Sequence, residues 1–250
     1  MRLIFTLLFV CLTVLSMLAQ NKKDSQGRKQ GVWEKYYPDA KTLIYSGQFK
    51  DDIPYGEFKY YYPSGKIKSI VRHEGAKRSY AWFYFENEEL MSEGLFRDMK
   101  KDSLWKNYNA QGFLLSTEVF KNNKLNGERR VFYIQDQVET GEVKCASIEM
   151  YKDSTLEGPY SQYLSSGVKV QEGTYLKGAK HGVWKSFHPN GTLASTIKYR
   201  NGKAYGYSYA YDEEGQEIYR TYWLDGDKLT KEDLAKYLEK CRKQGVIPEE

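Results

Sequence analysis

Three histidines are the side chains best suited to acid–base chemistry near neutral pH, and their setting does not favour catalysis. His181 and His188 are expected in turns, and His73 late in a strand. No pair has the spacing of a zinc site, and the sequence contains no nucleophile elbow, phosphate loop or dinucleotide fingerprint. We therefore predict a protein that is not an enzyme, with no catalytic residue, no cofactor and no metal. An enzyme using His181 or His188 in a groove is the alternative.

Carboxylates and thiols give no stronger chemical signal. Acidic clusters at residues 51–52, 86–89 and 212–214 lack the alternating spacing of a calcium loop, which favours solvated turns. Cys145 and Cys241 match no metal spacing. A disulfide between them and two free thiols are both compatible with the sequence.

Aromatic side chains are the remaining candidates, and the chain contains 23 Tyr, 11 Phe and 5 Trp. Exposed rings can stack on sugars or anchor a protein interface. Alternatively, they can form the internal ladder of a thin sheet, in which each ring covers much surface. Their spacing favours the ladder for most of them, because they recur with a fixed period.

The period comes from the pattern Gly-x-aromatic-x-x-aromatic, which is seen at Gly31, Gly56 and Gly182. The same frame gives eight repeats, and their anchor residues are Gly31, Gly56, Tyr80, Ser103, Gly127, Gly158, Gly182 and Gly206. The intervals are 25, 24, 23, 24, 31, 24 and 24 residues, so one insertion of about seven residues falls around residues 135–147. A fixed period of this length indicates a repeat architecture.

Two aromatic columns run through the repeats, at the second and fifth residues after each anchor (positions 2 and 5). Position 2 is Arg129 in repeat 5 and Ser208 in repeat 8. The candidate binding or structural aromatics in the two columns are Trp33, Tyr36, Phe58, Tyr61, Trp82, Phe85, Trp105, Tyr108, Tyr160, Tyr163, Trp184, Phe187 and Tyr211.

Each repeat is expected to contain two strands and two turns. The segment Tyr62–Lys66 has Pro and Gly at turn corners, and Asn201-Gly202 is a strong hairpin signal. The predicted fold is all-β, an elongated single-layer antiparallel meander of about eight 24-residue hairpins and roughly sixteen strands. Positions 2 and 5 would point to opposite faces of a regular strand.

The two ends of the chain differ from the repeats. Thr230 to Asp233 is a helix-start signal, and Gly245 and Pro248 are stop signals, so a short helix is predicted there. This helix would cap the last hairpin or act as a docking peptide. The first residues, Met1-Arg2 and the apolar run Leu3–Leu18, are typical of a secretory signal peptide cleaved near Ala19.

We therefore expect three segments: a signal peptide at residues 1–19, a repeat domain at 20–226, and a helix and tail at 227–250. An uncleaved N-terminal anchor is the alternative for the first segment. Lipidation of Cys11 is rejected, because Val10 is not the small residue that lipoprotein processing requires. The protein is predicted to be exported, and thus periplasmic, outer-membrane-associated or secreted.

The repeats resemble a known family. Tyr45–Phe58 and Glu172–Trp184 follow the MORN pattern of aromatic-x-Gly-x-aromatic with a later Gly and a further aromatic, and Glu93–Asp98 follows it in part. The Tyr-Pro-x-Gly-x-Leu hairpin between them is similar to the bacterial MORN variant, often called YwqK-type antitoxins. This resemblance implies a scaffold that binds proteins or membranes, and the antitoxin label implies neutralisation of a toxin.

Charge and targeting narrow the function further. The net charge is +5, spread along the chain, and the basic stripe expected of a nucleic-acid-binding protein is absent. An antitoxin normally acts in the cytoplasm, which conflicts with an export signal. We therefore predict an exported scaffold for protein–protein interaction at the cell envelope. A glycan- or cell-wall-binding protein, contact with a membrane surface, and an immunity-type protein that neutralises a toxin are the alternatives.

Overall fold

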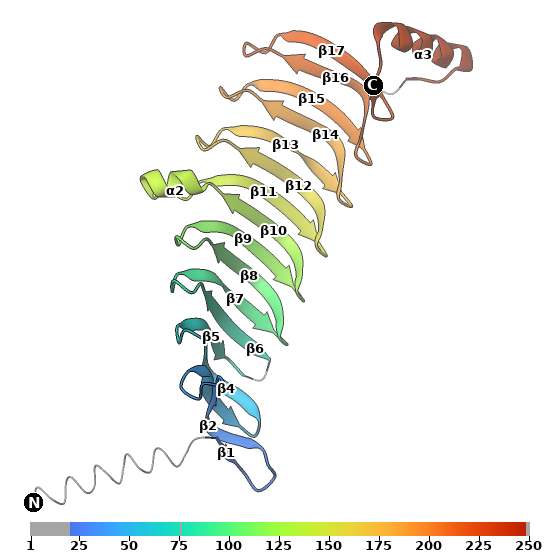
Figure 1. Cartoon of the computed structure of the whole chain (residues 1–250). Helices are drawn as coiled ribbons and strands as arrows, with labels where there is room; N and C mark the ends of the chain where they lie inside the picture. The colour runs from blue at the N-terminus through green and yellow to red at the C-terminus, as the bar shows by residue number, and fades with distance from the viewer. Residues whose placement is uncertain (1–20, 76, 249–250) are drawn as a thin grey trace, which may run out of the picture. The chain divides into compact units, whose positions relative to one another are not determined.

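The computed structural model describes residues 21–75 and 77–248, which form antiparallel β-strands with two short helices (Figure 1). The predicted signal peptide lies outside these residues. The chain divides into two compact units, with the boundary between Phe113 and Leu114. Each unit is described separately below.

The first unit contains eight strands. Each pairs in antiparallel fashion with the next one along the chain. The strands are β1 (Lys22–Lys23), β2 (Lys29–Tyr36), β3 (Leu43–Lys50), β4 (Ile53–Tyr61), β5 (Ile67–His73), β6 (Arg78–Tyr84), β7 (Leu90–Arg97) and β8 (Lys100–Tyr108).

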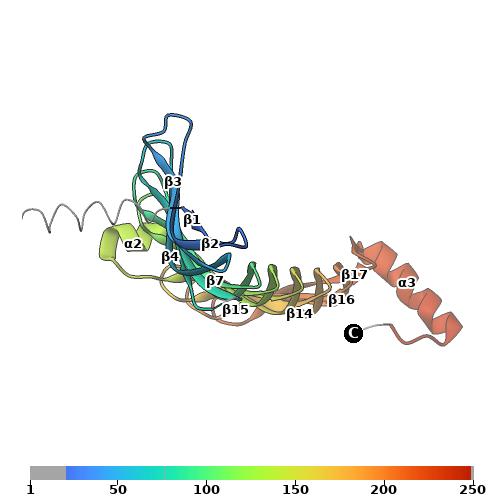
Figure 2. The same cartoon turned by 90° about the horizontal axis from the view of Figure 1, so that it is seen from below.

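The second unit continues the same scheme with ten strands and two helices, again with antiparallel neighbours. Its elements are β9 (Leu114–Lys121), β10 (Lys124–Phe132), α2 (Ile134–Thr140), β11 (Cys145–Lys152), β12 (Thr155–Tyr163), β13 (Lys169–Leu176), β14 (Ala179–Phe187), β15 (Leu193–Arg200), β16 (Lys203–Tyr211), β17 (Glu217–Leu224), β18 (Asp227–Lys228) and α3 (Lys231–Gln244). In Figure 2 the strands of this unit form a single layer, and neither α2 nor α3 covers a face of it.

The predicted single-layer meander of hairpins is confirmed. The sixteen expected strands are β2–β17, and the two-residue strands β1 and β18 extend the sheet at the first and last repeats. Few of the described side chains are buried, and the others are half-buried or exposed, as a single layer requires. The core therefore consists of contacts between neighbouring strands on the faces of the sheet.

Turn chemistry follows the sequence at both ends of the strands. Asn201 and Gly202 have φ of 52° and 82°, as the type I′ hairpin turn requires, and Lys177-Gly178 has the same form. The turns at the other ends of the strands form the opposite rim of the sheet. There Gly65 adopts φ of 83°, and Ala40 takes the equivalent place in repeat 1 with φ of 55°. The turn residues therefore fix the register of most hairpins.

Repeat 3 corrects the predicted alignment by one residue. Tyr84, the last residue of β6, pairs with Leu90 across a register shift, as Tyr61 pairs with Ile67 in repeat 2. Tyr84 therefore holds position 5, and Ala81 rather than Trp82 holds position 2. The physical reason is the β5–β6 pair, which runs in continuous register and lacks the bulge that precedes position 2 elsewhere.

The insertion in repeat 5 folds into helix α2, which the sequence analysis did not predict. Gly141 ends the helix in a left-handed conformation with φ of 74°. The Gln137 side chain is buried, and its amide bonds to both the N–H and the carbonyl of Leu114 on β9, at 2.9 and 2.8 Å. One buried amide therefore fastens the helix to the sheet.

The C-terminal helix is confirmed. Thr230 caps α3 by accepting a hydrogen bond from the N–H of Asp233, and Gly245 ends the helix with φ of 64°. The Tyr237 ring lies 5.5 Å from the Tyr222 ring of β17, and Cys241 is buried. Hydrogen bonding to Tyr222 and Cys241 raises the pKa of Tyr237. These contacts place α3 against the last hairpin, beside β17 (Figure 1).

Candidate functional site

The sheet of each unit has two chemically different faces. Position 2 side chains such as Phe58 and Trp184 lie on one face, together with the rings that contact them, and we call it the aromatic face. The alternate residues, such as Glu57, Lys59 and Lys185, lie on the other, the charged face. Positions 2 and 5 point to opposite faces, as the sequence spacing predicts.

On the aromatic face, a ring at position 2 lies directly over a glycine of the preceding strand. A Cβ atom added to Gly47, Gly94 or Gly173 would lie 2.3 Å from the ring of Phe58, Trp105 or Trp184, respectively. The bulge at the anchor places three residues of one strand opposite this single glycine, as the β13–β14 register shows. The glycine of the repeat motif is therefore a seat for the next ring.

The seated rings are core residues. Phe58, Trp105 and Trp184 are 2%, 0% and 3% exposed. The indole N–H of Trp105 donates to the Leu95 carbonyl at 3.1 Å, and that of Trp184 donates to the Thr174 carbonyl at the same distance. These rings cannot stack on a ligand without leaving the sheet.

Half-buried rings surround each seated ring. Around Trp184, the centroids of Tyr160, Tyr175 and Tyr199 lie at 5.5, 5.0 and 6.3 Å, and the Lys180 ammonium lies 4.1 Å above the indole. Burial raises the pKa of the three tyrosines and lowers that of Lys180. The edges of this cluster remain accessible to solvent.

The other predicted aromatics occupy several environments. At position 2, Trp33 and Tyr160 are half-buried on the aromatic face. Trp82 is shifted to the charged face, 4.7 Å from the Tyr80 ring, and Phe85 lies in the turn after β6. Position 5 residues lie on the charged face; Tyr36 is exposed, and the half-buried ones are Tyr61, Tyr108, Tyr163, Phe187 and Tyr211. The structure therefore does not gather the thirteen candidates into one site.

In repeat 5, a charged side chain occupies the position that a seated aromatic ring occupies in other repeats. Arg129 holds position 2 and pairs with Glu118 and Glu149 on the neighbouring strands, at 3.2 and 3.0 Å. Burial alone would lower the pKa of Arg129, but the two carboxylates raise it.

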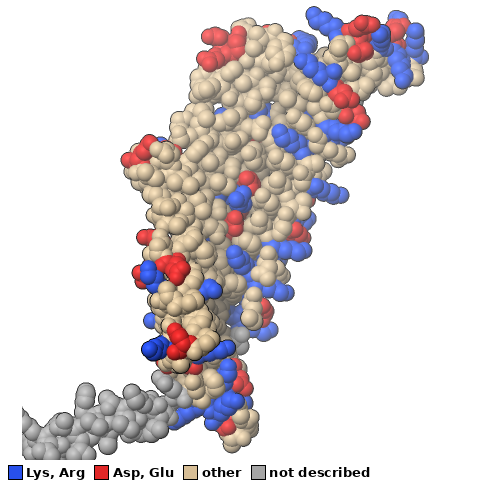
Figure 3. Space-filling model, viewed as in Figure 1, with Lys and Arg blue, Asp and Glu red and all other residues tan. Residues whose placement is uncertain are grey.

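Figure 3 shows a face that is largely free of charge across its middle, with Lys and Arg gathered along one rim.

A third column, at position 6, was not predicted from the sequence. The hydroxyls of Tyr37 and Tyr62 donate to the carbonyls of Tyr61 and Tyr84, the position 5 residues of the next repeat, at 3.0 and 2.7 Å. Two later repeats have the same bond, from Tyr133 to Tyr163 and from the Nε2 of His188 to Tyr211. The signal in the sequence was a ring with a polar tip directly after position 5. His188 thus has a structural role.

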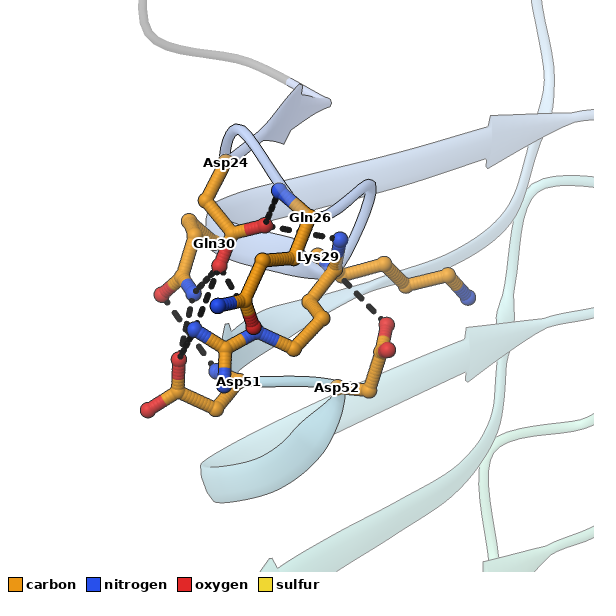
Figure 4. A network of polar contacts seen from close by, with 7 residues as sticks. Asp24, Gln26, Lys29, Gln30, Asp51 and Asp52 are labelled. Atoms are coloured by element: carbon orange, nitrogen blue, oxygen red, sulfur yellow. Dashed lines mark hydrogen bonds and ion pairs between the residues drawn. The ribbon is translucent and has the colours of Figure 1, made fainter.

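Networks of polar side chains connect turns and strands at other places in the sheet. In the first unit, the Asp24 carboxylate accepts hydrogen bonds from the backbone of Gln26 and the side chains of Arg28 and Gln30, and Gln30 also reaches Asp51 (Figure 4). Partial desolvation alone would raise the pKa of Asp24, but the hydrogen bonds lower it to about 2. The network joins the turn after β1 to the turn between β3 and β4.

Glu93 organises a second network, on the charged face of the first unit. It accepts hydrogen bonds from the hydroxyls of Tyr80 and Tyr108, both at 3.1 Å, and pairs with Lys106 at 3.3 Å. Burial alone would raise the pKa of Glu93, but these donors lower it below its ordinary value. Burial and the carboxylate raise the pKa of both tyrosines to about 12. The hydroxyls therefore stay protonated as donors.

The histidines and cysteines do not come together. His181 lies within β14, which corrects the predicted turn, and the Nδ1 of His73 bonds to Ser79 at 2.9 Å. Cys145 and Cys241 are both free thiols. Across residues 21–75 and 77–248, no group of three or more His, Cys, Asp or Glu side chains is placed to hold a metal ion.

An exposed apolar patch surrounds helix α2. Ile134 and Val138, one helical turn apart, are 40% and 56% exposed, and Val143 in the following loop is 52% exposed. An open hollow of about 270 Å³ begins just after this loop. Its lining residues are Lys144, Cys145, Ile148, Tyr163, Ser165, Ser166 and Gly167. We call Ile134, Val138 and Val143 together with this hollow the α2 patch.

Comparison with known families agrees with this repeat geometry. The MORN repeat variant matches residues 54–73 and 180–201, which cover β4–β5 and β14–β15, two hairpins with their anchor glycines. A search of curated proteins gave no match. None of the helices in the described part of the chain is long and apolar enough to span a membrane. The two matched hairpins are therefore similar to MORN repeats of the variant type, and this supports a MORN-repeat architecture for the chain.

Proposed function

We propose that this protein is an exported, non-catalytic scaffold that binds another protein at the cell envelope. The α2 patch is the observation that carries the proposal. MORN repeats generally mediate interactions with proteins or membranes, and each unit of this chain is a series of paired hairpins. The proposal of export rests on the apolar run Leu3–Leu18 after Arg2.

The α2 patch has the character of a protein-binding surface. The seven-residue helix α2 forms in the insertion that lengthens one interval between repeats to 31 residues, and it presents Ile134 and Val138 to solvent. Exposed apolar side chains beside a hollow are typical of interaction sites, because burying them in a partner removes them from water. Lys144 at the rim pairs with Asp136 and Glu142, which gives the patch a polar border.

The test compares two double variants of equal size on the same helix. Ile134→Ser with Val138→Ser removes the apolar surface, and Gln135→Ser with Glu139→Ser changes neighbouring exposed polar positions. Affinity capture from envelope fractions, quantified by mass spectrometry, should recover a protein with the wild type and the control that the first variant loses. Equal recovery by all three proteins would refute a role for the α2 patch.

Export is tested separately. The N-terminus of the protein isolated from cells should begin at Gln20, as measured by intact mass. Deleting residues 2–19 should retain the protein in the cytoplasm. A full-length chain that remains in the cytoplasm would contradict the proposed location.

A further inference from the structure

Uncharged polar side chains form a continuous row on the aromatic face of the second unit. The register pairs Ser147 with Gln162, Gln162 with Gln171, Gln171 with Ser186, and Ser186 with Ser195, across strands β11 to β15. Paired residues of neighbouring strands point to the same face. Five successive strands therefore present a hydroxyl or an amide at the same level of the sheet.

Several of these groups retain unused hydrogen-bonding capacity. Gln162 is exposed, and its amide oxygen has only a long 3.5 Å contact from the Tyr160 hydroxyl. The side-chain amide of Gln171 makes no hydrogen bond to any part of the chain that the structure describes. Ser186 and Ser195 bond to each other at 2.7 Å, which leaves lone pairs free.

A row of rings runs beside the polar row. Tyr160 and Trp184 are the position 2 residues of β12 and β14, and Tyr175 and Tyr199 flank them on β13 and β15. Lys180 is the only charged residue among those of β12–β15 that pair across the strands on the aromatic face beside these rings. Its ammonium lies over the Trp184 ring. The uncharged area in Figure 3 agrees with this composition.

We propose that this surface binds an extended, neutral, 1→4-linked polysaccharide, lying across the strands. Neighbouring strands are about 4.8 Å apart. One pyranose ring of an extended 1→4-linked chain advances by nearly the same distance, so each sugar would meet one strand. Ring hydroxyls would bond to the Ser and Gln row, and the apolar faces of the sugars would lie on the exposed edges of the tyrosines.

The chemistry of the surface decides between classes of ligand. On the aromatic face of β12–β15, an anionic polymer would meet only the Lys180 ammonium among the paired residues, and this ammonium already lies against the Trp184 indole. Burial also lowers the pKa of Lys180. A purely apolar partner would leave the Gln162 and Gln171 amides without hydrogen bonds. A polyhydroxylated neutral chain satisfies both the amides and the rings.

The test uses the full chain and four oligosaccharide probes. Isothermal titration with cellohexaose and with the hexamer of N-acetylglucosamine should show binding to at least one of them. A hexamer of 1→6-linked glucose and a hexamer of 1→4-linked galacturonic acid should bind at least about tenfold more weakly, because they lack the extended form or the neutrality.

Variants locate the site. Gln162→Ala with Gln171→Ala should weaken binding by about tenfold or more, from the loss of two hydrogen-bonding side chains. Ser161→Ala with Thr174→Ala, on the opposite face of the same two strands, should leave affinity within about twofold. Far-UV circular dichroism and thermal midpoints check that both variants fold.

Four results would overturn the proposal. They are no binding of either neutral hexamer, equal binding of all four probes, unchanged affinity in the glutamine variant, and a dimer formed through this face that excludes the sugar. The proposed protein site is distinguishable, because Ile134→Ser with Val138→Ser should keep full affinity for the oligosaccharide.

Discussion

The Trp184 ring lies directly over Gly173, so the effect of Gly173→Ala on stability should depend on whether the ring is present. The substitution should destabilise the wild type but not a variant that lacks the ring. Gly173 lacks the positive φ of the turn glycines, so its backbone can accept alanine. The added methyl group, however, would lie 2.3 Å from the Trp184 ring, whereas ordinary carbon contacts lie at about 3.5–4.0 Å. Since Trp184 is 3% exposed and fixed by its bond to the Thr174 carbonyl, Gly173→Ala should destabilise the protein by about 1–3 kcal/mol.

The second arm of this double-mutant cycle removes the ring. Trp184→Ala should destabilise by about 3–5 kcal/mol, as expected for deletion of a buried tryptophan. In that background the space above Gly173 is empty. Adding Gly173→Ala should then be neutral or stabilising by about 0.4–1 kcal/mol, because alanine restricts the unfolded chain.

The assay is urea unfolding followed by far-UV circular dichroism, which does not depend on the missing indole. Gly182→Ala is the matched control, since it has φ of 69° and open space around its Cβ. Its effect comes from the backbone alone and should be the same with or without Trp184. If Gly173→Ala destabilised both backgrounds equally, the ring would not be seated on the glycine and the reasoning would fail.

Three further predictions concern the polar contacts. Tyr133→Phe removes the hydroxyl that donates across to the next repeat, and should lower the free energy of unfolding by about 1 kcal/mol in urea titrations. Asp24 has a folded pKa of about 2, below its ordinary 3.8, so its contribution to stability should be present above about pH 4 and lost as the pH falls towards 2. Thermal unfolding of Asp24→Asn should lack that component of the pH dependence, and an identical acid profile would contradict the assignment. Arg129→Ala leaves Glu118 and Glu149 facing each other without a cation, and should destabilise the protein by about 1–3 kcal/mol at low salt but less at about 1 M salt, which screens the repulsion between the two carboxylates. Equal destabilisation at low and high salt would show that packing, not charge, is what Arg129 provides.

Much of the fold could be predicted because each repeat marks its own turns. Asn201-Gly202 specifies a two-residue turn, and a glycine four residues after position 5 specifies the other rim. The helix start at Thr230 was equally explicit, with a capping hydroxyl and Asp233 three residues later. These are local signals that a single sequence carries in full.

Local signals alone could not align repeat 3 with the other repeats. The segment from Tyr80 to Phe85 is aromatic at nearly every residue, so two alignments fit the aromatic columns equally well. The pairing of Ala81 with Gly94 decides between them, and it is a contact between strands that spacing alone does not reveal. Helix α2 was missed for a related reason, since seven residues are too few for a helix that is stable without packing.

The candidate site was less predictable than the fold. The sequence placed rings at position 2, but only the bulge and the glycine seat show that Trp105 and Trp184 are buried. The polar row through Gln162 and Gln171 depends on register across several strands. Aromatic content alone therefore could not separate a structural ladder from a binding surface.

The two rims of the sheet differ in how freely they can change during evolution or engineering. At the rim of two-residue turns, the N–H groups of Gly178 and Gly202 bond to the carbonyls of Leu156 and Lys180 in the preceding repeat. A longer turn there would break a link between neighbours. At the other rim, helix α2 has been accommodated while the bond from Tyr133 to the next repeat is kept. That rim is where foreign loops should be grafted, and where this repeat architecture can acquire new recognition elements without rebuilding its frame.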